Sequence, residues 1–462
     1  MEPSNDIEHR RTATARAWDL GRGAVIVASG LPLAIAGTDA YHSFHAHPEF
    51  LYLAGETVAG ATLTFDAADG WTLFAPVASL EDRVWMGDGR SLDELAGATG
   101  IGQVLPGDRL GPWLEKHRGE PVAVAGNHDF LVHPGAYGAH NWRALEIEVD
   151  AELSERLSVL LAEQRRAKSP AEIARIRRAV AASVPGHFAA MRLARPGMTE
   201  RELQVEIEAE FFRNGGDRTA YGSIVGSGPN AAILHVAPGP RAMAPGDLVL
   251  VDAAAEYRGY ASDITRTFPV SPRFSGIQRD LYELVLDVQQ AAIANVRPGV
   301  EYKDLHLAAS RQIAEGLVAL DILRGDPDDL VDRDAHALFF PHGLGHMLGL
   351  ATHDAGGCLA GRTPSDRFGL KWLRADLPLA EGYVVTVEPG IYFIPAIIQD
   401  PERREAFADA VNWERVDELA SFGGIRIEDD VLVTATGAEV LSVAIPKSVA
   451  SLETIRQEAL SA

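Results

Sequence analysis

The sequence of 462 residues contains one cysteine, Cys358, which excludes a disulfide framework and a zinc site built on cysteine ligands. Positive charge is also scarce, because 42 Lys and Arg stand against 65 Asp and Glu and give a formal net charge of −23. Such an acidic chain repels phosphate groups, so we expect no nucleic-acid partner and no binding to an anionic membrane surface.

Long apolar runs are missing as well. The start, MEPSNDIEHRR, has no apolar core of a signal peptide, and the uncharged stretch 23–38 is too short to cross a bilayer. Hydrophobic residues still make up 47% of the chain and charged residues 23%, so a packed core can form. We therefore expect a soluble, cytoplasmic, globular protein with no membrane partner.

The first part of the chain predicts a mixed α/β domain with helix signals between short strands. A capping box then begins at Ser169, with Pro170 in the first helical turn and Glu172 at the third position. We place a boundary before this helix, which predicts an N-terminal α/β domain over 1–166 and a second domain over 167–462. The strand-like runs of the first domain are 24–28, 50–54, 61–65 and 121–125.

The second domain contains a repeated pattern. Residues 195–203, RPGMTEREL, match residues 297–305, RPGVEYKDL, and each copy stands between two amphipathic helices and precedes strand-like segments. Pro and Gly also end helices without any repeat, so this interpretation stays open beside a true duplication. A duplication predicts two similar α/β halves that face each other across a site.

Two aspartates lie in the segment VDAAAEYRGYASDITRTF, which predicts a β-hairpin. With the turn centred between Tyr257 and Arg258, the numbers of opposed residues sum to 515. Asp252 and Asp263 then face each other directly, which is unfavourable unless a cation lies between them. The alternative is an off-centre turn with both carboxylates in solvent.

Three histidines follow an apolar run in FFPHGLGHMLGLATHD. His342 and His346 are four residues apart, but Gly343 and Gly345 favour a loop over a helix. A single histidine here is more often part of a core than a ligand. Three histidines among glycines, with His353 as the third, favour a site.

Two further strand-like segments each carry a glutamate. Glu388 ends the apolar run YVVTV, where an unpaired carboxylate would be costly. In GGIRIED, alternation places Arg426 and Glu428 on one face of a strand. A surface ion pair would explain this face equally well.

These segments together offer four carboxylates and one imidazole. Two divalent cations would balance the four negative charges and leave room for a hydroxide between them. Oxygen-rich ligands with a single imidazole favour Mn²⁺, with Co²⁺ or Zn²⁺ as alternatives. Two such metals activate a shared water and polarise a carbonyl, which is hydrolytic chemistry. The candidate ligands are Asp252, Asp263, His346, Glu388 and Glu428.

The same segments resemble the pita-bread metallopeptidases, in the branch of prolidase and aminopeptidase P. All five metal-ligand positions of that family are present in order over about 167–462. The resemblance implies an α/β (α+β) chain with an N-terminal creatinase-like domain and a C-terminal pita-bread domain built by an internal pseudo-twofold duplication. It also implies a homodimer that cleaves small peptides with proline at the second position.

Residue roles follow from this resemblance. Glu388 would take the proton of the attacking water, His235 would lie near the substrate's amino end, and His353 would hydrogen-bond the scissile carbonyl. His342 would line the proline pocket, and Tyr221 resembles a pocket-lining tyrosine of prolidases. Arg426 would orient the metal carboxylates. Asp263 and Glu428 would bridge the two metals.

Prolidase and aminopeptidase P differ in the part of the substrate that they accept beyond the proline. A dipeptidase must bind a free carboxylate there, and Arg374 in LKWLR resembles the arginine that prolidases use for it. We therefore expect an Xaa-Pro dipeptidase, with an Xaa-Pro aminopeptidase as the alternative. A non-catalytic binding protein on this fold is disfavoured because the ligand set is complete, and a serine hydrolase because G-x-S-x-G is missing.

Overall fold

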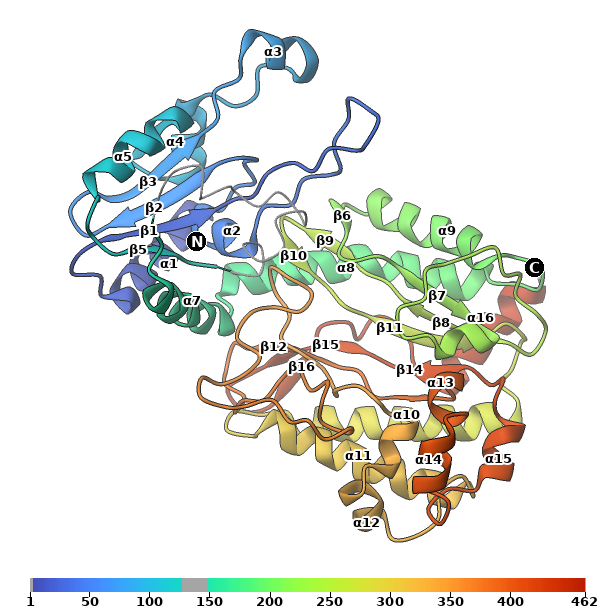
Figure 1. Ribbon diagram of the computed structural model, residues 1–462. Helices are drawn as coiled ribbons and strands as arrows, with labels where there is room; N and C mark the ends of the chain where they lie inside the picture. The colour runs from blue at the N-terminus through green and yellow to red at the C-terminus, as the bar shows by residue number, and fades with distance from the viewer. Residues whose placement is uncertain (1–2, 127–147, 462) are drawn as a thin grey trace. The chain divides into compact units, whose positions relative to one another are not determined.

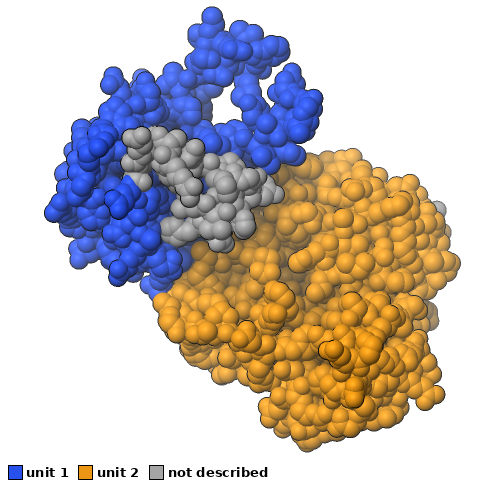
Figure 2. Space-filling model, in the orientation of Figure 1, with its two compact units in different colours: residues 1–165 blue, residues 166–462 orange. Residues whose placement is uncertain are grey.

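The computed structural model describes residues 3–126 and 148–461 (Figure 1). The chain divides into two compact units, residues 1–165 and 166–462 (Figure 2). Within the described ranges, no helix has the length and apolar character needed to cross a membrane.

Unit 1 is built on a five-stranded sheet in the order β4-β3-β2-β1-β5. The pairs β1–β2 and β2–β3 are antiparallel, whereas β1–β5 and β3–β4 are parallel. Strand β1, AVIVA, is buried on both faces, which explains why it is apolar throughout. The strands are β1 (Ala24–Ala28), β2 (Thr62–Asp66), β3 (Gly70–Ala75), β4 (Gln103–Pro106) and β5 (Val122–Val124).

The helices of unit 1 include one that the sequence analysis interpreted wrongly. Residues 50–54 form most of helix α2 and not a strand. Pro48 occupies the first turn and Gly55 ends the helix with φ 74°, while a continuous apolar run fits either structure. The helices are α1 (Pro3–Trp18), α2 (Pro48–Ala54), α3 (Leu80–Met86), α4 (Leu92–Thr99), α5 (Leu110–Lys116) and, reaching the boundary, α7 (Ala151–Arg166).

Unit 2 begins with its first half, in which two long helices precede the strands. Ser169 caps α8 through the expected capping box with Glu172. The strands form one sheet β11-β8-β7 and a smaller one β10-β9-β6. The elements are α8 (Pro170–Leu193), α9 (Glu200–Arg213), β6 (Arg218–Thr219), β7 (Ile224–Ser227), β8 (Leu248–Asp252), β9 (Ala255–Tyr257), β10 (Tyr260–Ala261) and β11 (Thr265–Pro269).

The second half repeats the order of helices and strands with short helices inserted. Its sheets are β12-β15-β16 and β13-β14. The final helix α16 packs on α8. The elements are α10 (Gly276–Asn295), α11 (Tyr302–Ala319), α12 (Pro327–Asp332), β12 (Val384–Val387), β13 (Gly390–Tyr392), α13 (Pro395–Ile398), α14 (Pro401–Ala406), α15 (Trp413–Glu418), β14 (Gly424–Arg426), β15 (Asp429–Val433), β16 (Ala438–Val440) and α16 (Val449–Ser461).

The internal duplication is confirmed by matching backbone hydrogen bonds. Gly197 N–H donates to the Met243 carbonyl, and Gly299 N–H donates to the Leu379 carbonyl in the same way. Both glycines have a left-handed backbone, with φ of 88° and 86°. The strands of both halves lie side by side between α8 and α9 on one side and α10 and α11 on the other (Figure 1).

Candidate metal centre and active site

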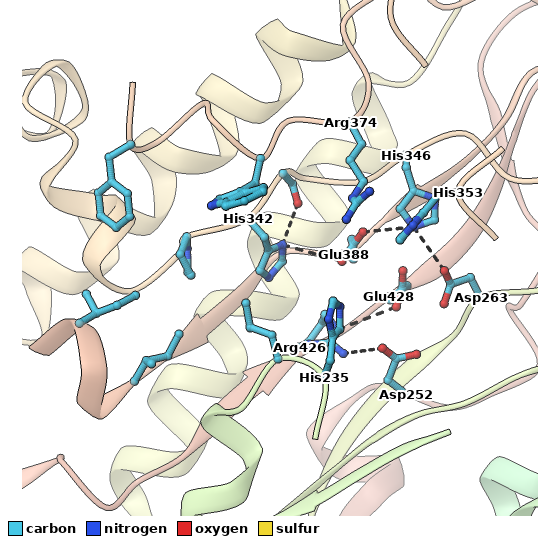
Figure 3. A pocket seen from close by; sticks show the side chains of 18 residues that line it. His235, Asp252, Asp263, His342, His346, His353, Arg374, Glu388, Arg426 and Glu428 are labelled. Atoms are coloured by element: carbon cyan, nitrogen blue, oxygen red, sulfur yellow. Dashed lines mark hydrogen bonds and ion pairs between the residues drawn. The ribbon is translucent and has the colours of Figure 1, made fainter. Parts of the chain in front are cut away.

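A cavity of about 410 Å³ in unit 2 collects the predicted site residues (Figure 3). Ten of the eleven side chains proposed from the sequence line it, and Tyr221 is the exception. The ten are His235, Asp252, Asp263, His342, His346, His353, Arg374, Glu388, Arg426 and Glu428.

The two aspartates come from neighbouring strands, but not in the register that the sequence analysis expected. Asp252 pairs with Thr265, so opposed residue numbers sum to 517 and direct opposition to Asp263 was wrong. The turn consists of Arg258 and Gly259, whose φ angles of 48° and 82° suit a two-residue hairpin turn. Because the shift is two residues, Asp263 stays on the same face as Asp252, as its diagonal neighbour.

The two glutamates lie just beyond the paired strands of the second half. Glu388 directly follows β12, and Glu428 directly precedes β15. The ladder that joins these strands pairs Val387 with Asp429, so its next position brings Glu388 opposite Glu428. A backbone bridge between Glu428 and Thr265 then joins this pair to the strand that follows Asp263.

His346 reaches the carboxylates from a loop, as its flanking glycines predict. A side chain at Gly345 would place its Cβ 2.2 Å from the Thr386 carbonyl oxygen, so only glycine allows the loop this close to β12. The His346 N–H in turn donates to Thr386 Oγ1 over 3.1 Å. The loop is therefore fixed against the strand that leads to Glu388.

The ring of His346 is oriented for ligation. Its Nδ1 lies 3.0 Å from the Met347 carbonyl oxygen, which can only accept a proton, so Nδ1 carries the hydrogen. Nε2 then presents its lone pair to the carboxylates, 3.3 Å from Asp263 Oδ2 and 3.5 Å from Glu388 Oε1. This arrangement is typical of histidine metal ligands.

These donors fit a bound cation. Ligand atoms of Asp263, His346 and Glu428 all lie within 4.8 Å of one another, and all three residues are buried. Burial, together with the charges of Asp263 and Glu388, raises the pKa of Glu428 well above its ordinary value. Burial is also the main cause that raises the pKa of Glu388 to about 7, although His346 and Arg426 oppose it. Buried carboxylates that repel one another are stabilised by metal cations.

Arg426 is the buried arginine that holds the carboxylates in place. It donates to Asp252 Oδ2 over 2.5 Å and, through Nε, to Thr265 Oγ1 over 3.1 Å. The Thr265 hydroxyl in turn donates to Glu428 Oε2 over 2.6 Å, so Arg426 supports Glu428 through Thr265. Thr265 was missed from the sequence, although it lies two residues after Asp263 and therefore on the same strand face.

Tyr392 is a second residue that the sequence analysis missed. Its hydroxyl accepts from Arg426 over 2.8 Å and therefore donates its own hydrogen to His342 Nε2 over 2.9 Å. His342 Nδ1 donates to the Gly343 carbonyl over 2.8 Å, so both ring nitrogens are occupied. Burial, aided by the charge of Arg426, lowers the pKa of His342 to about 3. His342 is therefore a neutral wall of the cavity and not a proton donor to a ligand.

The other predicted residues lie at the exposed rim or behind the ligands. His235, His353 and Arg374 are exposed and line the cavity. The His353 ring stands edge-on to the His346 ring with centroids 4.4 Å apart. Tyr221 donates its hydroxyl hydrogen to Asp252 Oδ1 over 2.5 Å, so it contacts a carboxylate and does not line the cavity.

Comparison with known families decides where the chain belongs. Residues 174–435 match metallopeptidase family M24, and residues 7–121 match the aminopeptidase P N-terminal domain. The chain belongs to family M24, in its aminopeptidase P branch. This family is one of metal-dependent peptidases, which agrees with the donor set of the cavity.

The similarity to individual relatives extends over both units. The chain is 33% identical to the Xaa-Pro aminopeptidase of Escherichia coli over 463 residues, 97% of each chain. It is 35% identical to a probable Xaa-Pro aminopeptidase of Botryotinia fuckeliana over 430 residues, 92% of this chain and 90% of the relative.

Solved structures show the same fold. The aminopeptidase PepP of Pseudomonas aeruginosa aligns with a TM-score of 0.82 at 32% identity, over 100% of this chain and 99% of that one. Aminopeptidase P of Escherichia coli with the inhibitor Pro-Leu aligns with a TM-score of 0.81 at 31% identity, over 100% of both chains. The predicted two-part α/β architecture with a pita-bread unit is thereby confirmed.

Proposed function

We propose that this protein is an Xaa-Pro aminopeptidase that releases the first residue of peptides with proline in second position. The observation that carries the proposal is similarity to Xaa-Pro aminopeptidases over both units, together with a donor set gathered in one cavity. The sequence analysis expected a dipeptidase first and this activity as the alternative. The relatives now favour the alternative.

The metal ligands are part of this proposal. Asp252, Asp263, His346, Glu388 and Glu428 would hold two divalent cations, with Asp263 and Glu428 shared between them. When bound, these cations lower the pKa of a water and polarise the scissile carbonyl. Mn²⁺ stays our predicted metal, with Co²⁺ or Zn²⁺ as alternatives, because oxygen donors outnumber the single imidazole.

Four residues act on the peptide or on the attacking water. Glu388 accepts the proton of the attacking water from its place beside His346. His353 donates a hydrogen bond to the oxygen of the scissile carbonyl, where negative charge develops. His235 lies near the free amino end. His342 holds the proline ring against its neutral edge, since both of its nitrogens already have partners.

Two residues support the carboxylates from behind. Arg426 keeps Asp252 and, through Thr265, Glu428 in a fixed orientation. Tyr221 donates to the second oxygen of Asp252, and we propose this contact in place of the pocket-lining role that the resemblance implied. We expect both residues to tune metal affinity and not to touch the peptide.

Dipeptidase activity is the second candidate function. It is supported by Arg374, which lines the cavity where an arginine would bind the free carboxylate of a dipeptide. In the aminopeptidase, the same arginine would meet the peptide beyond the proline. A non-catalytic binding protein is disfavoured because the complete donor set lines one cavity.

Assembly, location and domain limits stay predictions. We propose a homodimer, and the support is that helix α3 has no buried residue and exposes Leu80, Val84, Trp85 and Met86. We propose a catalytic domain over 167–462 and an N-terminal domain over 1–166, close to the division between the two compact units. A cytoplasmic location is proposed on the sequence alone.

Hydrolysis of two short peptides tests the proposed function. The purified protein, reconstituted with Mn²⁺, is offered Ala-Pro-Ala and Ala-Pro, with an EDTA-treated sample as control. Metal-dependent cleavage of the tripeptide supports the aminopeptidase. Cleavage of the dipeptide alone would establish the second candidate, and no cleavage of either by metal-loaded protein would contradict both.

A further inference from the structure

His353 is held in the cavity mainly through its backbone. Its ring is exposed at the rim and has no hydrogen-bond partner among the residues that the structure describes. The ring contacts the edge of His346, a weak and adaptable interaction. A side chain with so little direct support depends on the segment that carries it.

That segment is anchored near both ends. Leu348 N–H donates to the Val384 carbonyl of β12 over 2.9 Å, which ties its start to the sheet. Asp354 N–H donates to the Met347 carbonyl over 2.9 Å, so residues 347–354 form a closed loop. His353 therefore lies one residue before the point where the loop closes.

The closing residue, Asp354, also forms a buried ion pair. Lys168 Nζ lies 2.8 Å from Asp354 Oδ2, and the two side chains are 1% and 2% exposed. Lys168 is itself fixed at the entry to α8, where its N–H donates to the Gly382 carbonyl over 2.8 Å. The pair packs under the loop, because a Cβ at Gly349 would lie only 2.2 Å from Asp354 Oδ2.

Arg166 stabilises the residues that follow Asp354 by hydrogen bonds to their backbone carbonyls. Its Nε donates to the Gly356 carbonyl over 2.8 Å, and a terminal nitrogen donates to the Cys358 carbonyl over 3.0 Å. Two basic residues at the start of unit 2 thus secure residues 354–358. Lys168 acts through a charged pair, whereas Arg166 binds backbone.

We propose that Lys168, through Asp354, is the positioning residue for His353. This inference rests on the proposed function, since it needs His353 to contact the scissile carbonyl. A buried ion pair adds little net stability, because both charges lose their water on folding. The pair contributes to the geometry of the site. The Asp354 carboxylate fixes the backbone next to the His353 ring, which must lie close to the oxygen of the scissile carbonyl.

A variant without both charges tests this role. In Lys168→Met/Asp354→Asn the side chains keep nearly the same shapes and both charges of the pair are removed together, so the protein is expected to fold. We expect kcat for Ala-Pro-Ala to fall roughly 10²-fold, as for a misplaced catalytic group, while KM changes little. In the His353→Ala background the same two changes should lower kcat no further.

Two further measurements separate positioning from general destabilisation. In the metal-free protein, the protection of the backbone amide at position 354 against hydrogen exchange, relative to the intrinsic rate of the residue present there, should be lower in the pair variant than in the wild type. Arg456→Met is the matched control, because Arg456 is fully buried in unit 2, donates to the carbonyls of Met191, Ala194, Pro269 and Val270 and lies over the Phe268 ring, away from the cavity. This control should lower the melting temperature and leave both kcat and the Asp354 amide unchanged.

The outcomes are distinct. Wild-type kcat in the pair variant, or an equal loss in the His353→Ala background, would overturn the inference. Unchanged protection of the backbone amide at position 354 would overturn it as well. If wild-type protein fails to cleave Ala-Pro-Ala, the proposed function fails instead, and the exchange measurement still decides whether Lys168 orders the loop.

Discussion

The two halves of unit 2 carry the same backbone framework on different side chains. Residues 241–247 and 377–383 make equivalent hydrogen bonds, and the paired strands end equivalently at Val270 N–H to the Asp247 carbonyl and Val433 N–H to the Tyr383 carbonyl. Superposing these patterns makes Asp252 equivalent to Glu388. Both halves therefore supply a carboxylate at the same place.

The next equivalent positions differ. Asp263 corresponds to Arg426, and Thr265 corresponds to Glu428, by the two strand registers. Thr265 and Glu428 also contact each other across the halves. The duplication thus supplies the frame and one carboxylate from each half, Asp252 and Glu388. The departures from symmetry supply the rest: the first half has Asp263 where the second has Arg426, and Thr265 where the second has Glu428. Two identical halves would have no such site.

The largest effect on metal binding is expected when Glu428 is replaced by threonine, the residue that the first half has at the equivalent position, Thr265. In Glu428→Thr the donor is lost and the Thr265 hydroxyl loses its acceptor. We expect metal affinity to fall by more than about 10²-fold, which is the largest loss typical of residues that only orient a metal ligand. Hydrolysis of Ala-Pro-Ala should be abolished. Metal content by mass spectrometry and initial rates check this, with Glu439→Gln on the partly exposed strand β16 as control. Full activity in Glu428→Thr would contradict the metal assignment.

Removing the arginine that breaks the symmetry should have the next largest effect. Arg426→Met removes the guanidinium that donates to Asp252 and also to the Tyr392 hydroxyl. We expect a 10- to 100-fold loss of metal affinity, as for other residues that orient ligands. Arg426→Lys should recover little, since an ammonium cannot make both forked contacts. Equal affinity for the Lys and Arg proteins, by titration of the metal-free form, would refute this.

Each half also buries a neutral histidine, which predicts a pH dependence of stability. Burial lowers the pKa of His187 to about 3 and of His306 to about 4. The unfolded value is near 6.5, so the unfolded state binds more protons and stability falls as the pH drops below 6.5. The loss is roughly 1.4 kcal/mol per pH unit for each histidine between these values.

Melting temperature against pH, with metal removed, measures this dependence. His187→Gln and His306→Gln should each flatten the curve below pH 6.5, and the two together should flatten it further. An unchanged slope in both variants would show that these histidines are accessible to protons in the folded state.

The smallest effect is expected at Tyr392. Tyr392→Phe keeps the ring but removes the hydroxyl that donates to His342 and accepts from Arg426. One lost hydrogen bond of this kind costs about 1 kcal/mol, so we expect KM for Ala-Pro-Ala to rise about fivefold with kcat nearly unchanged. A change in kcat without one in KM would assign Tyr392 to the metal carboxylates and not to the proline pocket.

The comparison of halves also explains which features the sequence could predict. Asp252 and Glu388, which line the cavity, could be selected as candidate ligands from the sequence because a carboxylate in an apolar strand is costly without a cation. The hairpin register could not be predicted from the sequence, because Arg258 adopts a left-handed backbone conformation that is uncommon for arginine. The same-face conclusion survived only because the error was two residues and not one.

Other features depend on contacts that no local pattern reveals. The Lys168–Asp354 pair joins residues 186 positions apart. Tyr392 lies four residues after Glu388, and alternation along a strand could have placed both on one face. Tyr221 was expected by resemblance to line the substrate pocket, whereas its hydroxyl donates to Asp252. Residues 50–54 were wrongly predicted as a strand because an apolar run fits both a strand and a helix.

Cleavage of Xaa-Pro peptides by this protein would depend on two divalent cations held by five side chains. The most direct test is a titration of metal-free protein with Mn²⁺, in which bound metal and the rate of Ala-Pro-Ala hydrolysis are measured on the same samples. We predict two bound equivalents per chain and a rate that appears as they fill. Hydrolysis without metal, or two bound equivalents with no hydrolysis, would contradict the account.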